Sequence, residues 1–376
     1  MSKVTVAGHI CIDITPIFPQ KENSGEMTDV LLPGHLIHMD GVNVHTGGAV
    51  ANTGLAMKKL GADVKLMGKL GDDAFGKMVL SVLAEHGYDA SRDMIISQGE
   101  RTSYSVVLAM PGIDRIFLHD PGANDTFCYD DLDMNEIAVT DLFHFGYPPL
   151  MRKMYEDDGA ELVKIMKAVK ELGVATSLDM AAVDASSDAG KADWRKILGN
   201  VMPYVDFFVP SVEELCFMLD RDRYNEWTER AAGKDMTMVL DPQEDIKPLA
   251  DELIAMGAKV VLIKSGAPGM YYRTADADTL FHVGKSAGID ANLWADLDGF
   301  EKSYKPDKIL SGTGAGDTSI AAFLTAMLEG REPLECLHLS SATGTSCVES
   351  YDALGGLKSF DELLMKINAG WEKQTF

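Results

Sequence analysis

The sequence lacks the patterns that mark several common protein classes. No run approaches the ~18 consecutive apolar residues of a membrane span, and residues 1–3 lead into a short apolar run without a long h-region. The five cysteines include no C-x-x-C pair, which beside 21 methionines is typical of a reducing compartment. We therefore expect a cytoplasmic protein with no membrane partner.

Basic residues are also scarce. Lys and Arg number 34 against 58 Asp and Glu, so the formal net charge is −24. A nucleic-acid binder needs a basic footprint, and none is visible, so no nucleic-acid partner is expected. If the ligand is a nucleotide, local groups such as a metal ion and a helix N-terminus must offset this unfavourable field.

What is present is an alternation of strands and helices. Residues 4–12 and 64–67 have the pattern of buried strands, and residues 49–60 and 75–86 the periodicity of helices. Later segments repeat this order, which predicts an α/β fold with a doubly wound, mostly parallel sheet. The charged segments 220–243 and 286–308 are interpreted as surface insertions.

Two segments break this alternation. Residues 15–43 are rich in Pro, Gly and polar residues, and residues 102–119 alternate like a hairpin turning at Pro111-Gly112. Together they predict a small β-lid. The α/β core is then expected to comprise residues 1–14, 44–101 and 120–376.

The strongest chemical signal is a glycine-rich turn, Ser311-Gly312-Thr313-Gly314-Ala315-Gly316-Asp317-Thr318, directly before an apolar helix. The free N–H groups of such a helix start, together with its dipole, favour an anion. Asp317 would lie at the mouth of this site as a proton acceptor for a substrate hydroxyl. Alternatively, Asp317 only caps the helix. Neither G-x-x-x-x-G-K-[ST] nor G-x-G-x-x-G fits the chain.

The turn resembles the C-terminal signature of the ribokinase-like (PfkB) carbohydrate kinases. Three further stretches are similar to family motifs and occur in family order: Gly47-Gly48-Ala49-Val50-Ala51-Asn52 with Gly68-Lys69-Leu70-Gly71-Asp72-Asp73, Gly122-Ala123-Asn124, and Lys264-Ser265-Gly266-Ala267-Pro268-Gly269. The resemblance covers residues 4 to about 356. It implies ATP and Mg²⁺ as cofactors.

The resemblance also implies roles for individual residues. Asp317 would be the base, and the backbone N–H groups of Gly314, Ala315 and Gly316 would stabilise charge on the transferred phosphoryl group. The substrate would contact Asp13, Gly48 and Asn52, and the nucleotide Lys264, Gly266, Gly269 and Thr313. Asp13 could instead form a turn before Pro16, and Asn52 could simply be a polar residue near a helix start.

Two positions depart from the family pattern. Glu214 matches the acidic residue of the N-x-x-E motif that helps to place Mg²⁺ through waters, but Ser211 replaces its Asn. Ser311 stands where cation-activated members have Asp, so a monovalent cation is doubtful and little dependence on K⁺ is expected.

The resulting prediction is an ATP-dependent kinase that phosphorylates a hydroxyl of a small sugar or sugar-like substrate. One alternative is a nucleoside kinase of the same fold, for which Phe18, Tyr104 and Phe117 are candidate base-stacking residues. Another is a catalytically silent, ligand-binding regulator. Because lid strands expose β-edges, we also expect a homodimer formed through the lid.

Overall fold

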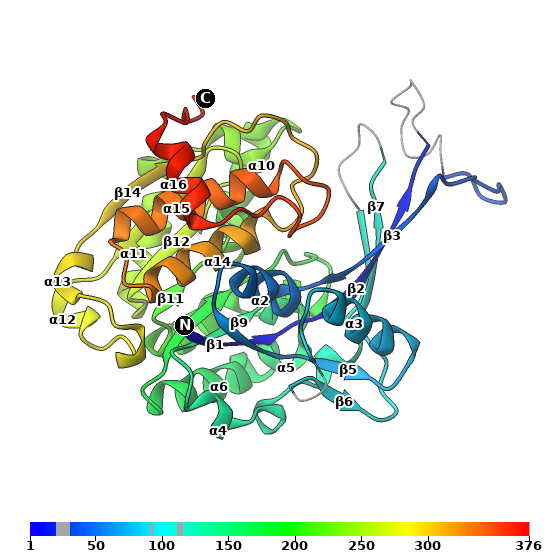
Figure 1. Cartoon of the computed structure of the whole chain (residues 1–376), viewed down its shortest axis with the longest axis horizontal. Coiled ribbons are helices and arrows are strands. Elements are labelled where there is room, and N and C mark those ends of the chain that lie inside the picture. The colour runs from blue at the N-terminus through cyan, green and yellow to red at the C-terminus, as the bar shows by residue number, and fades with distance from the viewer. Residues whose placement is uncertain (20–30, 91–92, 111–115, 376) are drawn as a thin grey trace.

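The computed structural model describes residues 1–19, 31–90, 93–110 and 116–375 (Figure 1). Its main sheet has eight strands in the order β14-β13-β12-β11-β10-β9-β1-β4, in which β13 pairs antiparallel with both β12 and β14 and all other neighbours pair parallel. The predicted doubly wound, mostly parallel sheet is confirmed. The strands are β1 (Lys3–Gly8), β4 (Asp63–Met67), β9 (Leu142–Gly146), β10 (Ala175–Asp179), β11 (Phe207–Phe208), β12 (Val260–Lys264), β13 (Gly269–Thr274) and β14 (Asp298–Lys302).

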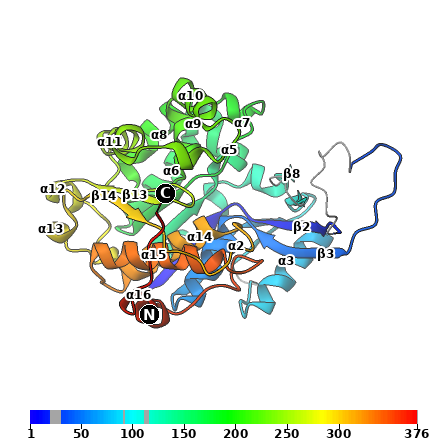
Figure 2. The same ribbon diagram turned by 90° about the horizontal axis from the view of Figure 1, so that it is seen from above.

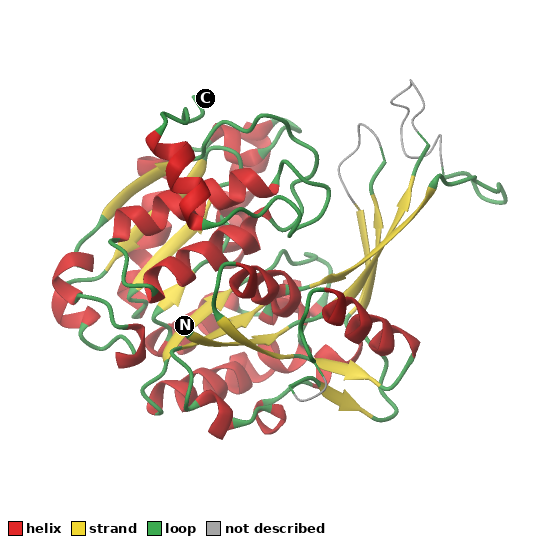
Figure 3. Cartoon of the chain, in the orientation of Figure 1, coloured by secondary structure: helices red, strands yellow, loops and turns green. Residues whose placement is uncertain are grey.

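Helices cover both faces of this sheet (Figures 2 and 3). Alternate residues of one strand therefore enter different cores: Val260 and Leu262 belong to one cluster, and Val261 and Ile263 to the other. Burial on both faces explains why these strands are continuous apolar runs. One layer contains α2 (Ala49–Lys59), α14 (Ala315–Leu328) and α15 (Pro333–Cys347); the other contains α6 (Ala160–Glu171), α8 (Trp194–Val201), α9 (Val212–Leu219) and α11 (Lys247–Met256).

The other described α-helices complete these layers and the connections between them. They are α3 (Ala74–Glu85), α4 (Met134–Ile137), α5 (Arg152–Tyr155), α7 (Asp188–Lys191), α10 (Arg221–Ala231), α12 (Ala277–Leu280), α13 (Ala291–Trp294) and α16 (Phe360–Asn368). No helix in the described residues combines the length and apolar character needed to cross a membrane.

A separate four-stranded sheet projects from this body, as both views show (Figures 1 and 2). This lid sheet has the order β3-β2-β7-β8, formed by β2 (Cys11–Ile17), β3 (Gly41–Gly47), β7 (Tyr104–Leu108) and β8 (Ile116–Asp120). The hairpin pairing of β7 and β8 is confirmed, while its predicted turn at Pro111-Gly112 lies outside the described residues. A small parallel pair, β5 (Lys69–Gly71) and β6 (Ile95–Ser97), lies at its base.

Two sequence-based interpretations of the fold are wrong. The strand predicted over residues 4–12 is two strands, because the chain leaves the main sheet after Gly8 and enters the lid sheet at Cys11. Segment 286–308 is not a surface insertion, since it supplies the edge strand β14 and buries Trp294 to 3 % exposure. The charged residues of β14 (Asp298–Lys302) masked the apolar pattern by which a strand is predicted.

Candidate active site

The order of the strands creates a switch point in the main sheet. β1 pairs with β4 on one side and with β9 on the other, so the chain winds away from β1 in both directions. In open α/β sheets, ligands bind in the crevice at the carboxyl ends of the strands at such a point. His9 and Tyr147 directly follow β1 and β9, and His9 N donates to Gly146 O at 3.1 Å.

The glycine-rich turn delivers the N-terminus of α14 to this crevice. Gly314 is the N-cap residue with φ 75°, and a Cβ there would lie 2.3 Å from the Ala353 Cβ, so only glycine fits. The helix then begins at Ala315, whose neighbours in the first turn present N–H groups with no intrahelical partner. The glycine-rich turn therefore does lead into a helix, and Gly316 and Asp317 lie in the first turn of that helix.

Asp317 is buried and held by donors from three directions. Its Oδ1 accepts from Tyr147 OH at 2.6 Å and from Thr53 Oγ1 at 3.4 Å, and its Oδ2 accepts from Asn52 Nδ2 at 3.0 Å. The N-cap is Gly314 without a side-chain cap, so the interpretation of Asp317 as a helix cap is wrong. The carboxylate points into the site instead of back onto its own helix.

Tyr147 was not foreseen from the sequence. Its backbone is left-handed, with φ 65° and ψ 44°, a conformation that costs a non-glycine residue roughly 1–3 kcal/mol. Burial raises the pKa of its phenol, and the nearby Asp317 and Asp179 raise it further. The hydroxyl therefore stays protonated and donates to Asp317. Strain that directs a side chain onto a buried carboxylate is typical of functional sites.

The residues predicted to contact the substrate lie around this carboxylate. Asn52, in α2, was expected to bind substrate hydroxyls, but its amide donates to Asp317. Gly48 is the N-cap of α2, with φ 86°, and a Cβ there would lie 2.5 Å from His9 O. Asp13 lies in the lid strand β2, where Cys11 Sγ donates to its Oδ1 at 3.3 Å. Burial raises the pKa of Asp13.

A cavity of about 420 Å³ opens on the other side of the α14 N-terminus. Residues from the β12–β13 turn, the glycine turn and α15 line it, including Lys264, Gly266, Gly269, Gly312, Ala315, Gly316, Ser341, Gly344 and Gln374. Four residues predicted on the nucleotide side or in the glycine turn therefore share one hollow with Lys264. Thr313 is not among the lining residues: it is exposed, and its N–H donates to Ser311 Oγ at 3.1 Å.

Lys264 lies between this cavity and a buried carboxylate that the sequence did not reveal. Its Nζ donates to Asp179 Oδ1 and Oδ2 at 2.7 and 2.9 Å. Burial raises the pKa of Asp179 to about 7, although Lys264 opposes that shift. Burial acts to lower the pKa of Lys264, but Asp179, Glu214 and Asp317 outweigh it and raise the pKa. The ammonium group therefore keeps its charge next to the α14 N-terminus.

Glu214 combines a structural role with a place near the site. It forms a capping box with Ser211: Ser211 N donates to Glu214 Oε2 at 2.9 Å, and Glu214 N donates to Ser211 Oγ at 3.3 Å. Its charge also acts on Lys264, Asp179 and Tyr147, so it faces the same crevice. The described residues contain no group of three or more His, Cys, Asp or Glu that could hold a metal by themselves. This donor set fits Mg²⁺ only as an ion held mainly by phosphates and waters.

With this geometry established, comparison with known proteins gives the family. The model of the pfkB family of carbohydrate kinases matches residues 1–358. The chain belongs to this family. It is therefore a carbohydrate kinase, a phosphotransferase with an alcohol group as acceptor.

Individual relatives of this pfkB kinase are distant in sequence. A sugar kinase of Archaeoglobus fulgidus, described as uncharacterized, is 25 % identical over 300 residues, which are 79 % of this chain and 96 % of that protein. Fructokinase-2 of Oryza sativa is 24 % identical over 310 residues, or 79 % and 77 % of the two chains.

Solved structures show the same fold. Ribokinase of Arabidopsis thaliana, complexed with ribose and ATP, superposes with a TM-score of 0.68 at 20 % identity, over 97 % of this chain and 98 % of that one. A putative ribokinase II of E. coli, in complex with ATP and Mg²⁺, has a TM-score of 0.69 at 20 % identity, over 98 % of this chain and 100 % of that one. The ribokinase-like fold and the sugar kinase family are thus established, whereas relatives named ribokinase and fructokinase leave the acceptor sugar undecided.

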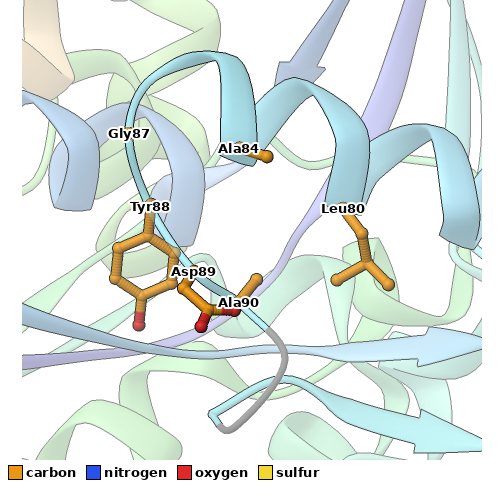
Figure 4. Close-up of a pocket in the computed structure, with 6 residues that line it drawn as sticks. All are labelled: Leu80, Ala84, Gly87, Tyr88, Asp89 and Ala90. Carbon is orange, nitrogen blue, oxygen red and sulfur yellow. The ribbon is translucent and has the colours of Figure 1, made fainter.

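Another hollow in the kinase is unrelated to this crevice. Residues at the end of α3 and in the turn that follows line it: Leu80, Ala84, Gly87, Tyr88, Asp89 and Ala90 (Figure 4). Tyr88 OH donates to Asp93 Oδ2 and accepts from Leu66 N, so its polar end is already satisfied. None of the residues predicted for the site lines it.

Three of the site residues that sequence reasoning missed share one property. His9, Tyr147 and Asp179 each end or directly follow a parallel strand of the main sheet, β1, β9 and β10. Polar residues at the carboxyl ends of predicted parallel strands were therefore the available signal.

Proposed function

We propose that this pfkB family kinase transfers the γ-phosphoryl group of ATP to a hydroxyl of a small sugar, with Asp317 as general base. The observation that carries the proposal is the buried Asp317 carboxylate in the first turn of α14, between the lid side of the crevice and the cavity beside Lys264. Phosphoryl transfer needs a proton acceptor and an anion-stabilising helix start within reach of one another.

In this mechanism, the acceptor hydroxyl approaches Asp317 from the lid side and gives its proton to the carboxylate. The donors Tyr147, Asn52 and Thr53 hold that carboxylate in one orientation, so that little reorganisation is needed when the proton arrives. The N–H groups at the start of α14 and the Lys264 ammonium group stabilise negative charge on the phosphoryl group being transferred. Mg²⁺, when bound, would supply charge neutralisation on the phosphates, and Glu214 would help to hold it through waters.

The aromatic residues of the lid support a sugar over a nucleoside as acceptor. Tyr104 packs against Phe75 of α3 with ring centroids 5.5 Å apart, and Phe18 is 9 % exposed. Phe18 is therefore too buried to stack on a base, and Tyr104 is partly occupied by its contact with Phe75. Phe117 is 54 % exposed and remains a candidate, so the phosphoryl-transfer screen should include nucleosides beside pentoses, hexoses and inositols.

Glu214→Gln tests the proposed link to Mg²⁺. The amide keeps the size of the side chain and one oxygen for the capping box, but it removes the charge that would attract the ion through water. We expect the Mg²⁺ concentration at half-maximal rate to rise several-fold, by about 3–10 times. Glu213→Gln, one residue earlier in the same helix turn, serves as the control. Identical Mg²⁺ titrations for the two variants would leave Glu214 with its capping role alone.

The apolar face of the lid sheet leads us to expect a homodimer. Ile14, Val44, Val106 and Leu118 are paired in register across its four strands, so one face of the sheet is apolar. α3 covers the base of this face, but Val42 and Leu118 remain 55 % and 53 % exposed. We expect light scattering at micromolar concentration to give twice the mass of one chain, and Leu118→Asp to halve that mass. A wild-type protein with the mass of a single chain would refute the pairing.

A further inference from the structure

The other face of the lid sheet carries a row of polar residues. His45, Asp13, Ser105 and His119 are direct neighbours in register on β3, β2, β7 and β8. Residues paired in this way point to the same side of a sheet. Asp13, already placed beside the acceptor, therefore shares its face with two histidines and a serine.

Hydrogen bonds organise this row. His119 Nδ1 and Ser105 Oγ are 3.0 Å apart, and Ser105 also hydrogen-bonds to Asp13, which Cys11 Sγ contacts from the same strand. His119 Nε2, however, is buried and has no hydrogen-bond partner in the described residues. The hydrogen bonds of the row fix the orientation of the His119 ring and leave Nε2 available for a further hydrogen bond.

A second imidazole faces His119 from the core. His9 lies between β1 of the main sheet and β2 of the lid, and its ring centroid is 5.2 Å from that of His119 and 6.2 Å from that of Tyr147. His9 is 1 % exposed, yet neither ring nitrogen has a partner among the described residues. Buried polar atoms rarely lack a hydrogen-bond partner, and a functional role is one explanation for such an exception. The His9 ring lies next to those of His119 on the lid and of Tyr147, which contacts Asp317.

We propose that His9 and His119 determine acceptor specificity by hydrogen-bonding to hydroxyl groups of the sugar, and that this site selects an uncharged polyhydroxylated acceptor over a sugar acid or sugar phosphate. The inference rests on the proposed function, because it concerns the acceptor of that reaction. It adds two neighbouring residues to the acceptor site, one from the core and one from the lid.

The charges around the crevice support this choice of acceptor. Burial lowers the pKa of His9 well below its ordinary value, with His119 adding to the effect, and burial also lowers the pKa of His119. Both rings are therefore neutral, and a neutral imidazole has one donor and one acceptor, which complements a hydroxyl group. Asp13 and Asp317 contribute two carboxylates, which would repel an anionic acceptor.

Two cations of the described residues near this crevice already have a carboxylate partner. Lys264 is paired with Asp179, and Arg101 at the rim lies 3.4 Å from Asp120 Oδ2. An incoming carboxylate or phosphate would therefore have to compete for a cation, whereas a neutral sugar would not.

Variants of His119 test the assignment without disturbing the base. His119→Leu removes both ring nitrogens, whereas His119→Gln keeps a polar group near the position of Nε2. We expect His119→Leu to raise KM for the acceptor about tenfold or more, while kcat and KM for ATP stay within about threefold of wild type. In His119→Gln, KM for the acceptor should lie between those of wild type and His119→Leu. His9→Asn should raise the same KM. His338→Asn, which removes a half-exposed imidazole that pairs with Glu301, is the control. Unchanged acceptor KM in His119→Leu would overturn the proposal, even if His9→Asn failed to fold.

A matched acceptor panel tests the selection by charge. Glucose, gluconate and glucose 6-phosphate, with the corresponding pentose series and myo-inositol, are compared by ADP release, and their binding is measured by calorimetry with a non-hydrolysable ATP analogue. We expect the neutral members to be favoured by about 100-fold or more in kcat/KM. The inference would be overturned if the sugar acids or sugar phosphates had an equal or higher kcat/KM than the neutral sugars. It would also be overturned if neither the neutral nor the anionic compounds bound. Selective binding of neutral sugars without any phosphoryl transfer would instead refute the proposed function and leave the histidine role standing.

Discussion

Asp317→Asn should lower kcat by roughly 10²–10⁴ while ATP still binds, because general-base catalysis contributes about that factor. The amide is close in size to the carboxylate and can accept hydrogen bonds from Tyr147 or Thr53, so the fold around α14 should persist. Since Gly314 is the N-cap residue, the helix start does not depend on this carboxylate. Steady-state kinetics and nucleotide titration would separate the lost rate from any loss of binding.

The control for this variant is Asp361→Asn. Asp361 is also an acidic residue in the first turn of a helix, α16, but it is exposed and far along the chain from the glycine turn. It should leave kcat unchanged. If Asp317→Asn also retained a rate within about threefold of wild type, another group would have to accept the proton.

Lys264→Met should damage both activity and stability. Removing a charged donor beside the α14 N-terminus is expected to lower kcat about 10²–10³-fold, as the loss of one oxyanion donor does in other enzymes. The same change leaves Asp179, which is 0 % exposed, without its counterion, and breaking a buried pair costs about 3–5 kcal/mol of stability. Kinetics and denaturant unfolding of one preparation would measure both effects.

A second substitution distinguishes the two causes. In Lys264→Met with Asp179→Leu, the buried charge is gone, so stability should largely return while kcat stays low. Lys69→Met is a matched control, because Lys69 is also buried and its Nζ lies 3.2 Å from Asp131 Oδ2, away from the crevice. It should lose stability but not catalysis. A double variant with wild-type kcat would reduce Lys264 to a purely structural ion pair.

The sequence by itself determined the fold class and the helix start on which the candidate site is built. Alternating apolar strands and helices predicted the parallel sheet, because burial on both faces leaves a local pattern in the chain. The turn from Ser311 to Asp317 predicted an anion-binding helix start, since glycines followed by an apolar helix are also a local pattern. The homodimer and the weak dependence on K⁺ expected from Ser311 stay predictions.

Only the tertiary structure decided which groups meet Asp317. Asn52 and Tyr147 contact its carboxylate from positions 265 and 170 residues away in the chain, and such contacts leave no periodicity that a sequence could reveal. Asp179 looked like any polar residue after a strand until Lys264, 85 residues later, was placed beside it. His9 and His119 face each other because β1 and β8 belong to different sheets that converge on one crevice. Local side-chain spacing fixes secondary structure, but the identity of each partner depends on how distant segments pack.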